Sequence, residues 1–77
     1  FSRTLNLHTI ESKISRELGL IEKKYKKFVN IGSYPFFRLG KVGVAVVSRS
    51  ISLIKLRKVN QDLLKMIKLK KIKILDV

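Results

Sequence analysis

Apolar residues recur along this chain with two different spacings, and the order of those spacings limits the folds open to it. Four segments alternate apolar and polar side chains, which is typical of strands. These segments are residues 3–8, 28–34, 41–49 and 71–77. Residues 9–26 and 53–67 instead place apolar side chains three or four positions apart, as amphipathic helices do. Residues 41–49 are apolar on both faces, so we expect them to form the most buried strand.

The order β-α-β-β-α-β predicts an α+β two-layer sandwich, ferredoxin-like or KH-like, in which a four-stranded antiparallel sheet carries both helices on one face. Right-handed crossovers place the two helices on the same side of the sheet. The residues expected in the core occupy the inward positions of these segments. They are Leu5, Leu7, Ile14, Leu18, Ile31, Val44, Val46, Leu56, Leu63, Ile67 and Ile74. The opposite face of the sheet is expected to be half exposed, and a partner is expected to lie there.

Capping and turn residues set the expected ends of these elements. Thr9 is the expected N-cap of the first helix. Tyr34-Pro35 is expected to end the second strand, because proline lacks a ladder donor, and residues 35–40 then form a connection. Gly19 either weakens the first helix or lets it approach the sheet closely. Three serines offer N-caps for the second helix: Ser48, Ser50 and Ser52.

The length of 77 residues predicts one small domain over residues 1–77, which buries only about 60% of its unfolded surface. The first residue is Phe1 rather than Met, which indicates a segment of a longer protein. The absence of cysteine excludes a disulfide scaffold and a Cys-based zinc site. The longest apolar run, at 42–47, is too short to span a membrane, and the chain opens without a signal-peptide pattern, so a cytoplasmic protein is expected.

The charge of the chain is strongly positive and regional. The formal net charge is +13, and ten Lys or Arg residues but no acidic residue lie between Glu22 and Asp62. Such a surface indicates an anionic partner, which is nucleic acid, a phosphorylated metabolite, an acidic membrane surface or an acidic partner domain. The candidate contacts are the bases of this stretch that cluster or adjoin aromatic residues. They are Lys23, Lys24, Lys26, Lys27, Arg38 and Lys41.

Each of these features also has a simpler interpretation. Lysines in a last helical turn complement the helix dipole, and lysines along a terminal strand protect a sheet edge from aggregation. Tyr34, Phe36 and Phe37 interleave with bases as on single-strand binding platforms, although aromatic residues at a strand end more often pack a domain interface. A GxxG sequence at residues 40–43 enters a strand instead of joining two helices, so a KH-type phosphate loop is not expected there.

Side chains that could carry out catalysis are scattered along the sequence. His8 has no acidic neighbour, the serines lack His and carboxylate partners, and the five carboxylates form no pair for acid–base chemistry. We therefore expect that this chain is not an enzyme by itself and that it binds no cofactor of its own.

Several short segments resemble the region that follows the molybdopterin-binding-like domain in CinA-type proteins and their FAD-synthase-like relatives. They are RTL at 3–5, ES at 11–12, EKKY at 22–25 and VNIGSYP at 29–35. The most distinctive part is 31–35. Within it the resemblance marks Gly32, Ser33, Tyr34 and Pro35 as a structural signature of the strand and its exit.

In that family the region is a small KH-like α/β module that lies after the domain that binds and processes nucleotides. The resemblance implies a commonly dimeric parent that either handles a pyrophosphate-containing nucleotide such as ADP-ribose, with nucleotide pyrophosphatase-like activity, or is a relative of unassigned activity. It also implies that the catalytic residues lie in other domains, because none of them map onto this chain. The high lysine content exceeds what the family implies, and this leaves a nucleic-acid role open.

Two main functional hypotheses follow. The first is a non-catalytic accessory domain of a CinA-like nucleotide-processing protein, which serves interdomain packing or homodimerisation near an anionic nucleotide. The second is a stand-alone RNA- or DNA-binding module that uses the six candidate bases. A third is an adaptor for a membrane surface or an acidic protein.

Overall fold

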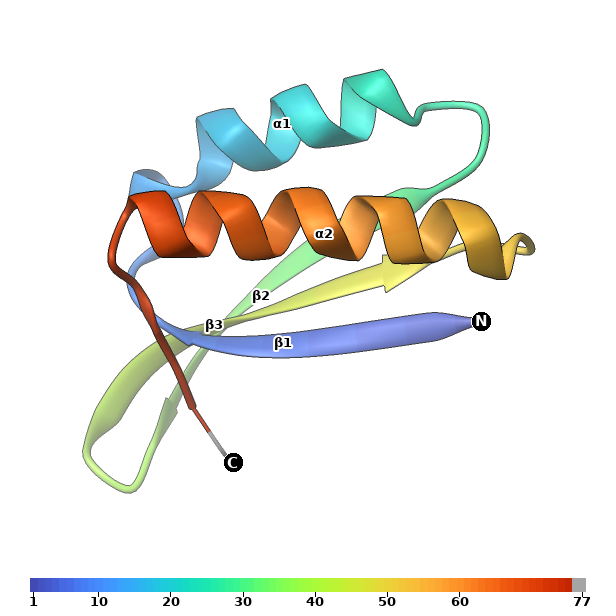
Figure 1. Ribbon diagram of the computed structural model, residues 1–77. Helices are drawn as coiled ribbons and strands as arrows, with labels where there is room; N and C mark the ends of the chain where they lie inside the picture. Colours follow the sequence, from blue (N-terminus) through green and yellow to red (C-terminus); the bar gives the residue numbers. More distant parts are fainter. Residues whose placement is uncertain (76–77) are drawn as a thin grey trace.

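The computed structural model describes residues 1–75, in which a four-stranded antiparallel sheet is covered on one face by two helices (Figure 1). The strands are β1 (Ser2–His8), β2 (Asn30–Arg38), β3 (Lys41–Arg49) and β4 (Lys73–Ile74). The helical elements are the single 3-10 turn η1 (Glu11–Lys13), α1 (Ser15–Lys24) and α2 (Leu53–Leu69). This arrangement confirms the predicted α+β two-layer sandwich.

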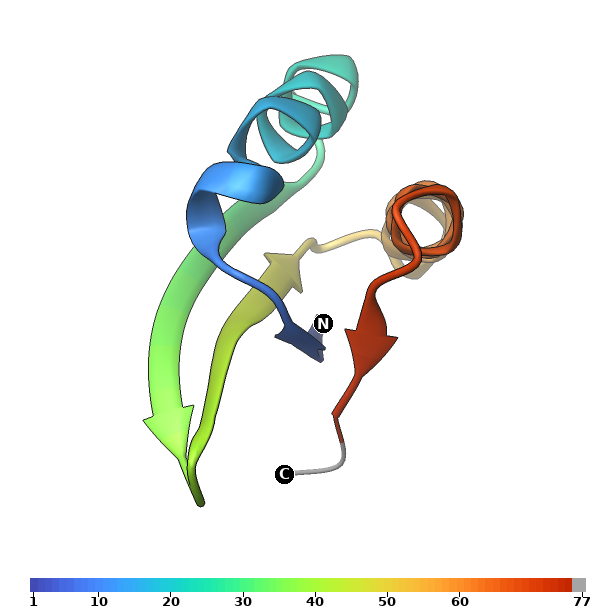
Figure 2. The same cartoon turned by 90° about the vertical axis from the view of Figure 1, so that its left-hand side faces the viewer.

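The strand order across the sheet is β2-β3-β1-β4, and neighbouring strands are antiparallel. β3 therefore lies between β1 and β2 and splits the β1-α1-β2 unit, which is the ferredoxin-like arrangement. Seen from the side, α1 and α2 form a second layer above the curved sheet, and β2 and β4 lie at its two edges (Figure 2). The lower part of the β2–β3 hairpin extends beyond the helices (Figure 1).

β2 continues through Pro35, so the prediction that Pro35 ends the strand was wrong. The register pairs Pro35 with Val44. The backbone N–H of Ile31 points away from β3 and donates to Glu22 Oε2 at 3.0 Å. Backbone N–H groups alternate in direction along a strand, so position 35 also faces outward from the sheet edge. Proline removes no ladder hydrogen bond at such a position.

The predicted connection over residues 35–40 is in fact a two-residue hairpin turn at Leu39 and Gly40. Both residues have positive φ, 52° for Leu39 and 74° for Gly40. Two successive left-handed residues form a type I′ turn, whose twist matches that of the flanking strands. The turn therefore lets the two strands stay paired as far as Arg38 and Lys41.

The two helices begin differently. α2 has Ser52 as its N-cap, because Ser52 Oγ accepts from the Lys55 N–H at 3.2 Å, which confirms one of the three predicted serines. Thr9 caps neither η1 nor α1, so that prediction was wrong. The backbone leaves helical geometry at Ile14, with φ −123° and ψ −9°, and the Ile14 side chain is fully buried. Packing of Ile14 thus sets the start of α1.

α2 ends in a Schellman motif, and this shortens the last strand. The Ile72 N–H donates to the Ile67 carbonyl oxygen at 3.0 Å, and the Lys71 N–H donates to that of Lys68 at 3.2 Å. Lys71 holds the left-handed position with φ 55°. β4 therefore starts at Lys73 and not at residue 71. Residues 76–77 of the predicted strand lie outside the described residues.

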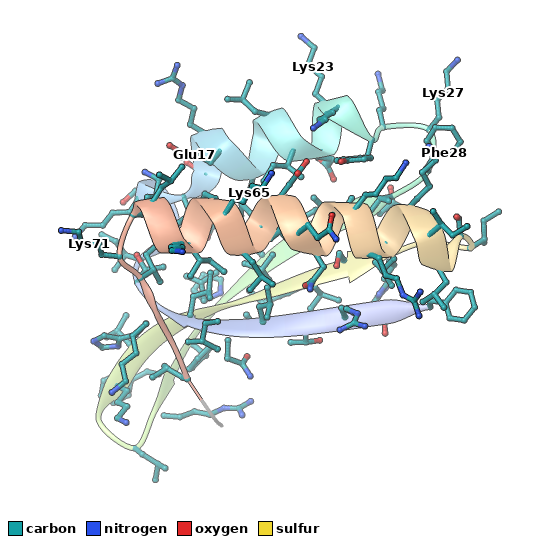
Figure 3. The ribbon with its side chains drawn as sticks, in the orientation of Figure 1. Glu17, Lys23, Lys27, Phe28, Lys65 and Lys71 are labelled. Atoms are coloured by element: carbon teal, nitrogen blue, oxygen red, sulfur yellow. The ribbon has the colours of Figure 1, made fainter. Side chains whose placement is uncertain are left out.

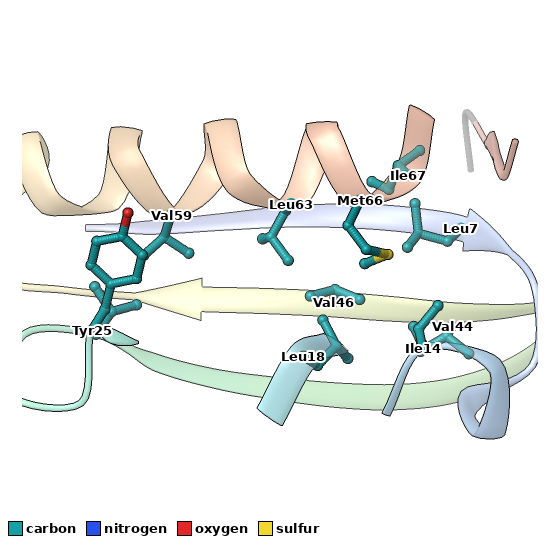
Figure 4. Packing of buried hydrophobic residues seen from close by; sticks show 11 residues of the cluster. Leu7, Ile14, Leu18, Tyr25, Val44, Val46, Val59, Leu63, Met66 and Ile67 are labelled. Carbon is teal, nitrogen blue, oxygen red and sulfur yellow. The ribbon is translucent and has the colours of Figure 1, made fainter. Parts of the chain in front are cut away.

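The core lies between the sheet and the helices, and its members largely match the prediction (Figure 4). Eight predicted residues are buried: Leu7, Ile14, Leu18, Val44, Val46, Leu56, Leu63 and Ile67. Leu5 and Ile31 are partly buried against this cluster. Ile74 is exposed, contrary to prediction, because it lies on the edge strand β4, and Ile72 packs against the core instead. The prediction missed five buried residues: Tyr25, Val29, Val59, Met66 and Leu75.

Candidate functional site

The distinctive segment 31–35 is fixed by two carboxylates from the first helical region. Glu22 Oε2 accepts from the Ile31 N–H at 3.0 Å, and Glu11 Oε1 accepts from Ser33 Oγ at 2.8 Å. These bonds tie the edge strand β2 to α1 and to η1. They also occupy polar groups that an unprotected edge would present to another strand.

Two aromatic rings of β2 lie against glycines on the sheet surface. A Cβ added to Gly32 would lie 2.9 Å from Tyr34 Oη, so the Tyr34 ring occupies the space beside this glycine. The Phe36 ring covers Gly43 of β3 in the same way. The guanidinium carbon of Arg38 lies 5.5 Å from the centroid of the Phe36 ring, which is a cation–π distance. Tyr34 nevertheless remains 54% exposed.

A second cluster joins the two helices. Asp62 Oδ2 accepts from Tyr25 Oη at 2.9 Å and pairs with Lys24 Nζ at 3.1 Å. Partial burial acts to raise the pKa of the Asp62 carboxyl, but the hydrogen bonds from Lys24 and Tyr25 outweigh it, so the pKa lies below its ordinary value. The hydrogen bond to Asp62 raises the pKa of the Lys24 ammonium. Burial, followed by this same carboxylate, raises the pKa of the Tyr25 hydroxyl.

The lowered pKa of Asp62 predicts a pH-dependent contribution to stability. A carboxyl whose pKa is lower in the folded state stabilises the fold above its unfolded pKa, and this contribution is lost as the pH falls through the folded pKa. Asp62→Asn should therefore lower the free energy of unfolding by about 1 kcal/mol at pH 7, and by progressively less as the pH falls below the ordinary Asp pKa of about 3.9. Urea unfolding of both proteins across this range measures the difference. A difference that is independent of pH would contradict the assignment.

All four carboxylates among residues 1–75 are engaged within the domain, since Glu17 Oε2 also pairs with Lys70 Nζ at 3.0 Å. Only Lys24 and Lys70 form ion pairs in this part of the chain. Most of the positive charge is therefore left without an internal counter-charge. This makes the excess of bases available to an external anion.

The sheet surface turned away from the helices is rich in bases, and we call it the open face. Val44 and Val46 of β3 are buried beneath the helices, so the alternate positions point the other way. Residues paired across antiparallel strands share a face. The open face accordingly presents Thr4, Asn6, His8, Tyr34, Phe36, Arg38, Lys41, Ala45, Val47, Arg49 and Lys73. No carboxylate of residues 1–75 belongs to this set.

The six predicted contact residues fall into two separate groups. Arg38 and Lys41 are a cross-strand pair on the open face, at the end of β2. The four lysines lie near the beginning of β2: Lys23, Lys24, Lys26 and Lys27. The eight steps along β2 separate its ends by about 26 Å at ~3.3 Å per residue. Lys23 and Lys27 point away from the sheet (Figure 3).

Sequence reasoning missed Arg49 and Lys73, which also lie on the open face, Arg49 at the end of β3 that is away from Arg38 and Lys41. A shallow hollow of about 150 Å³ lies on this face beside Tyr34 and Arg49. The alternation within residues 41–49 already placed Lys41 and Arg49 on the same side of one strand, so this signal was present in the sequence. An exposed aromatic ring beside a cation can contact an anionic ligand that has a planar group.

Neither α1 nor α2, the two α-helices of residues 1–75, is long and apolar enough to cross a membrane.

A family model described as FAD synthase, middle domain, matches residues 1–76. No curated protein and no solved structure matches the chain. The family match confirms the FAD-synthase-like part of the resemblance and supports an accessory role in a nucleotide-processing protein. The chain belongs to the FAD synthase middle-domain family.

Proposed function

We propose that this domain is a non-catalytic accessory module of a CinA-like nucleotide-processing protein, and that its open face packs against a neighbouring domain close to an anionic nucleotide. The observation that carries the proposal is the charge of the open face. Arg38, Lys41, Arg49 and Lys73 lie there, whereas every carboxylate of residues 1–75 is bound elsewhere in the domain.

The same observation favours a neighbouring domain over a second copy of this chain. A homodimer through the open face would bring two surfaces of the same positive sign together. The carboxylates that could relieve this repulsion already serve intramolecular bonds, such as those of Glu22 with Ile31 and Glu11 with Ser33. A phosphate-bearing ligand or an acidic domain surface supplies the missing negative charge.

Nucleotide affinity tests this proposal. In the natural polypeptide that carries residues 1–77, Arg38→Gln, Lys41→Gln and Arg49→Gln together should weaken the binding of ADP-ribose at least tenfold, because each charged contact contributes ~1.5 kcal/mol or more. Isothermal titration calorimetry at 0.1 M salt measures the dissociation constant. Arg57→Gln, Lys58→Gln and Lys68→Gln together are the matched control, since they also remove three charges and are exposed residues of α2 on the other layer.

The control should leave the dissociation constant within about twofold of the unchanged protein, because surface charges beyond a Debye length of ~10 Å are screened. Equal weakening by both sets of substitutions would indicate a general effect of net charge. We call the protein with Arg38→Gln, Lys41→Gln and Arg49→Gln the open-face variant. An unchanged dissociation constant for ADP-ribose in this variant would contradict the proposed role near a nucleotide.

The second candidate is binding of single-stranded RNA or DNA by the same face. It is favoured by the exposed ring of Tyr34, which shares a hollow with Arg49, and by the stacking of Arg38 on the Phe36 ring. Phosphate contacts make affinity fall steeply with salt. A salt titration with a generic oligonucleotide therefore separates the candidates, because absence of binding at low salt excludes this function and leaves the first intact.

A further inference from the structure

The end of the β2–β3 hairpin carries apolar side chains that nothing in residues 1–75 covers. We call residues 36–43 the arm. Phe37 and Val42 form a cross-strand pair on the face that the helices cover elsewhere, but the arm extends beyond the helices (Figure 1). Phe37 is 71% exposed and Leu39, at the tip, is 92% exposed. Exposed apolar side chains gathered in one place mark an interaction surface.

The residue at the first position of the hairpin turn, Leu39, is unusual for this type of turn. Type I′ turns favour Asn-Gly, because the first turn residue must adopt a left-handed conformation that is unfavourable for a branched aliphatic side chain. Here Leu39 holds that position with φ 52° while its side chain is in solvent. In the free domain, Leu39 therefore neither favours the conformation of the turn nor buries its side chain. Contact with a partner would account for both features.

A hollow of about 350 Å³ lies beside the arm, next to the start of the first helical region. Val42, Ile10 and Thr9 line it together with two basic residues, His8 and Lys13. Two of the lining residues contact each other, because His8 Nδ1 lies 3.1 Å from the Val42 carbonyl oxygen. We call this hollow and the adjoining Phe37 the arm notch. It is concave, it combines apolar with basic side chains, and no carboxylate of residues 1–75 lines it.

We propose that the arm notch receives a convex apolar segment, flanked by carboxylates, from another domain of the same polypeptide. This inference rests on the proposed accessory function, since a middle domain needs contacts that fix it to its neighbours. The apolar part of the segment packs on Phe37, Leu39 and Val42. Its carboxylates face Lys13, which lines the hollow and has no ion pair within residues 1–75.

Other occupants fit the arm notch less well. A second copy has the same charge of +13, and its four described carboxylates are already bound. A lipid surface is broad, whereas Val42 lies within a hollow beside Ile10. Addition of a strand to the edge of β2 is hindered at Pro35, which offers no donor at an outward position.

Photo-crosslinking tests the inference. A benzophenone amino acid is placed at position 37 of the natural polypeptide that carries residues 1–77, and the crosslinked peptides are identified by mass spectrometry. We expect an intramolecular crosslink to a peptide of another domain that contains apolar residues and Asp or Glu. Leu39→Asn with Val42→Thr should reduce its yield about tenfold, because the two changes remove exposed apolar anchors. Both changes suit a hairpin, so the fold is retained.

Ile51→Asn with Ile54→Thr provides the matched control, because these residues are also exposed but lie beyond the opposite end of β3. The control should leave the crosslink yield unchanged. A crosslink to a second copy, to lipid or to nucleic acid, or the absence of any crosslink, would overturn the inference. The readout needs no nucleotide, so its failure is distinguishable from an unchanged nucleotide affinity in the open-face variant.

Discussion

Gly43→Val is expected to destabilise the domain by about 3 kcal/mol, because the new side chain has no room on either side of the central strand β3. A Cβ at this position would lie 2.8 Å from the Leu7 carbonyl oxygen and would overlap the Phe36 ring. The ring can move, but the carbonyl belongs to the backbone of β1, which pairs with β3. Urea unfolding followed by circular dichroism measures the loss of stability.

Gly19→Ala is the control for this prediction. The sequence left open that Gly19 allows a close approach between helix and sheet, but no atom lies within 4 Å of the position of an added Cβ. Gly19 is an exposed residue inside α1, where alanine should stabilise the helix by about 0.5–1 kcal/mol. If both glycine substitutions destabilised the domain equally, the steric explanation for Gly43 would fail.

Leu63→Ala should have a similarly large effect, with a loss of about 3 kcal/mol in the free energy of unfolding. Leu63 lies on the inner side of α2, is only 1% exposed and packs in the main core cluster (Figure 4). Truncation removes buried methyl groups and leaves a cavity between α2 and the sheet. A domain of this length has a total stability of ~4–12 kcal/mol, so the loss is a large fraction of the whole.

Leu64→Ala, at the adjacent position, separates burial from helix propensity. Leu64 is 40% exposed on the outer side of α2, so its truncation should cost less than about 1 kcal/mol. Thermal unfolding of the two variants under one condition gives the comparison. Equal losses would show that α2 does not bury the face assigned to it.

The period of the apolar residues was sufficient to predict the order of elements, because each period belongs to one kind of backbone. The alternation in residues 41–49 placed β3, and the spacing of Leu56, Leu63 and Ile67 placed the inner side of α2. The predicted ends of elements were wrong where contacts with residues distant in the sequence determine them. Pro35 remains inside β2 because that strand is at the sheet edge, which local sequence does not reveal.

The candidate site was predicted in part. Charge counting found Arg38 and Lys41, but it could not show that they are cross-strand neighbours, because residues 35–40 were expected to form a connection. It also grouped them with four lysines at the other end of β2. Arg49 joins the open face only through the register of β2 with β3, which depends on the length of the turn at Leu39 and Gly40.

The central claim is that a neighbouring domain or its bound nucleotide covers the open face, and the two tyrosines allow a direct measurement. Tyr34 lies on the open face at 54% exposure, whereas Tyr25 is buried at 9% and serves as an internal standard. Nitration of the natural polypeptide that carries residues 1–77 is followed by mass spectrometry, with and without ADP-ribose. We predict that Tyr34 reacts nearly as slowly as Tyr25 when the nucleotide is bound, and faster after Arg38→Gln, Lys41→Gln and Arg49→Gln. Rapid nitration of Tyr34 under every condition would show that the open face stays uncovered, and would contradict the account.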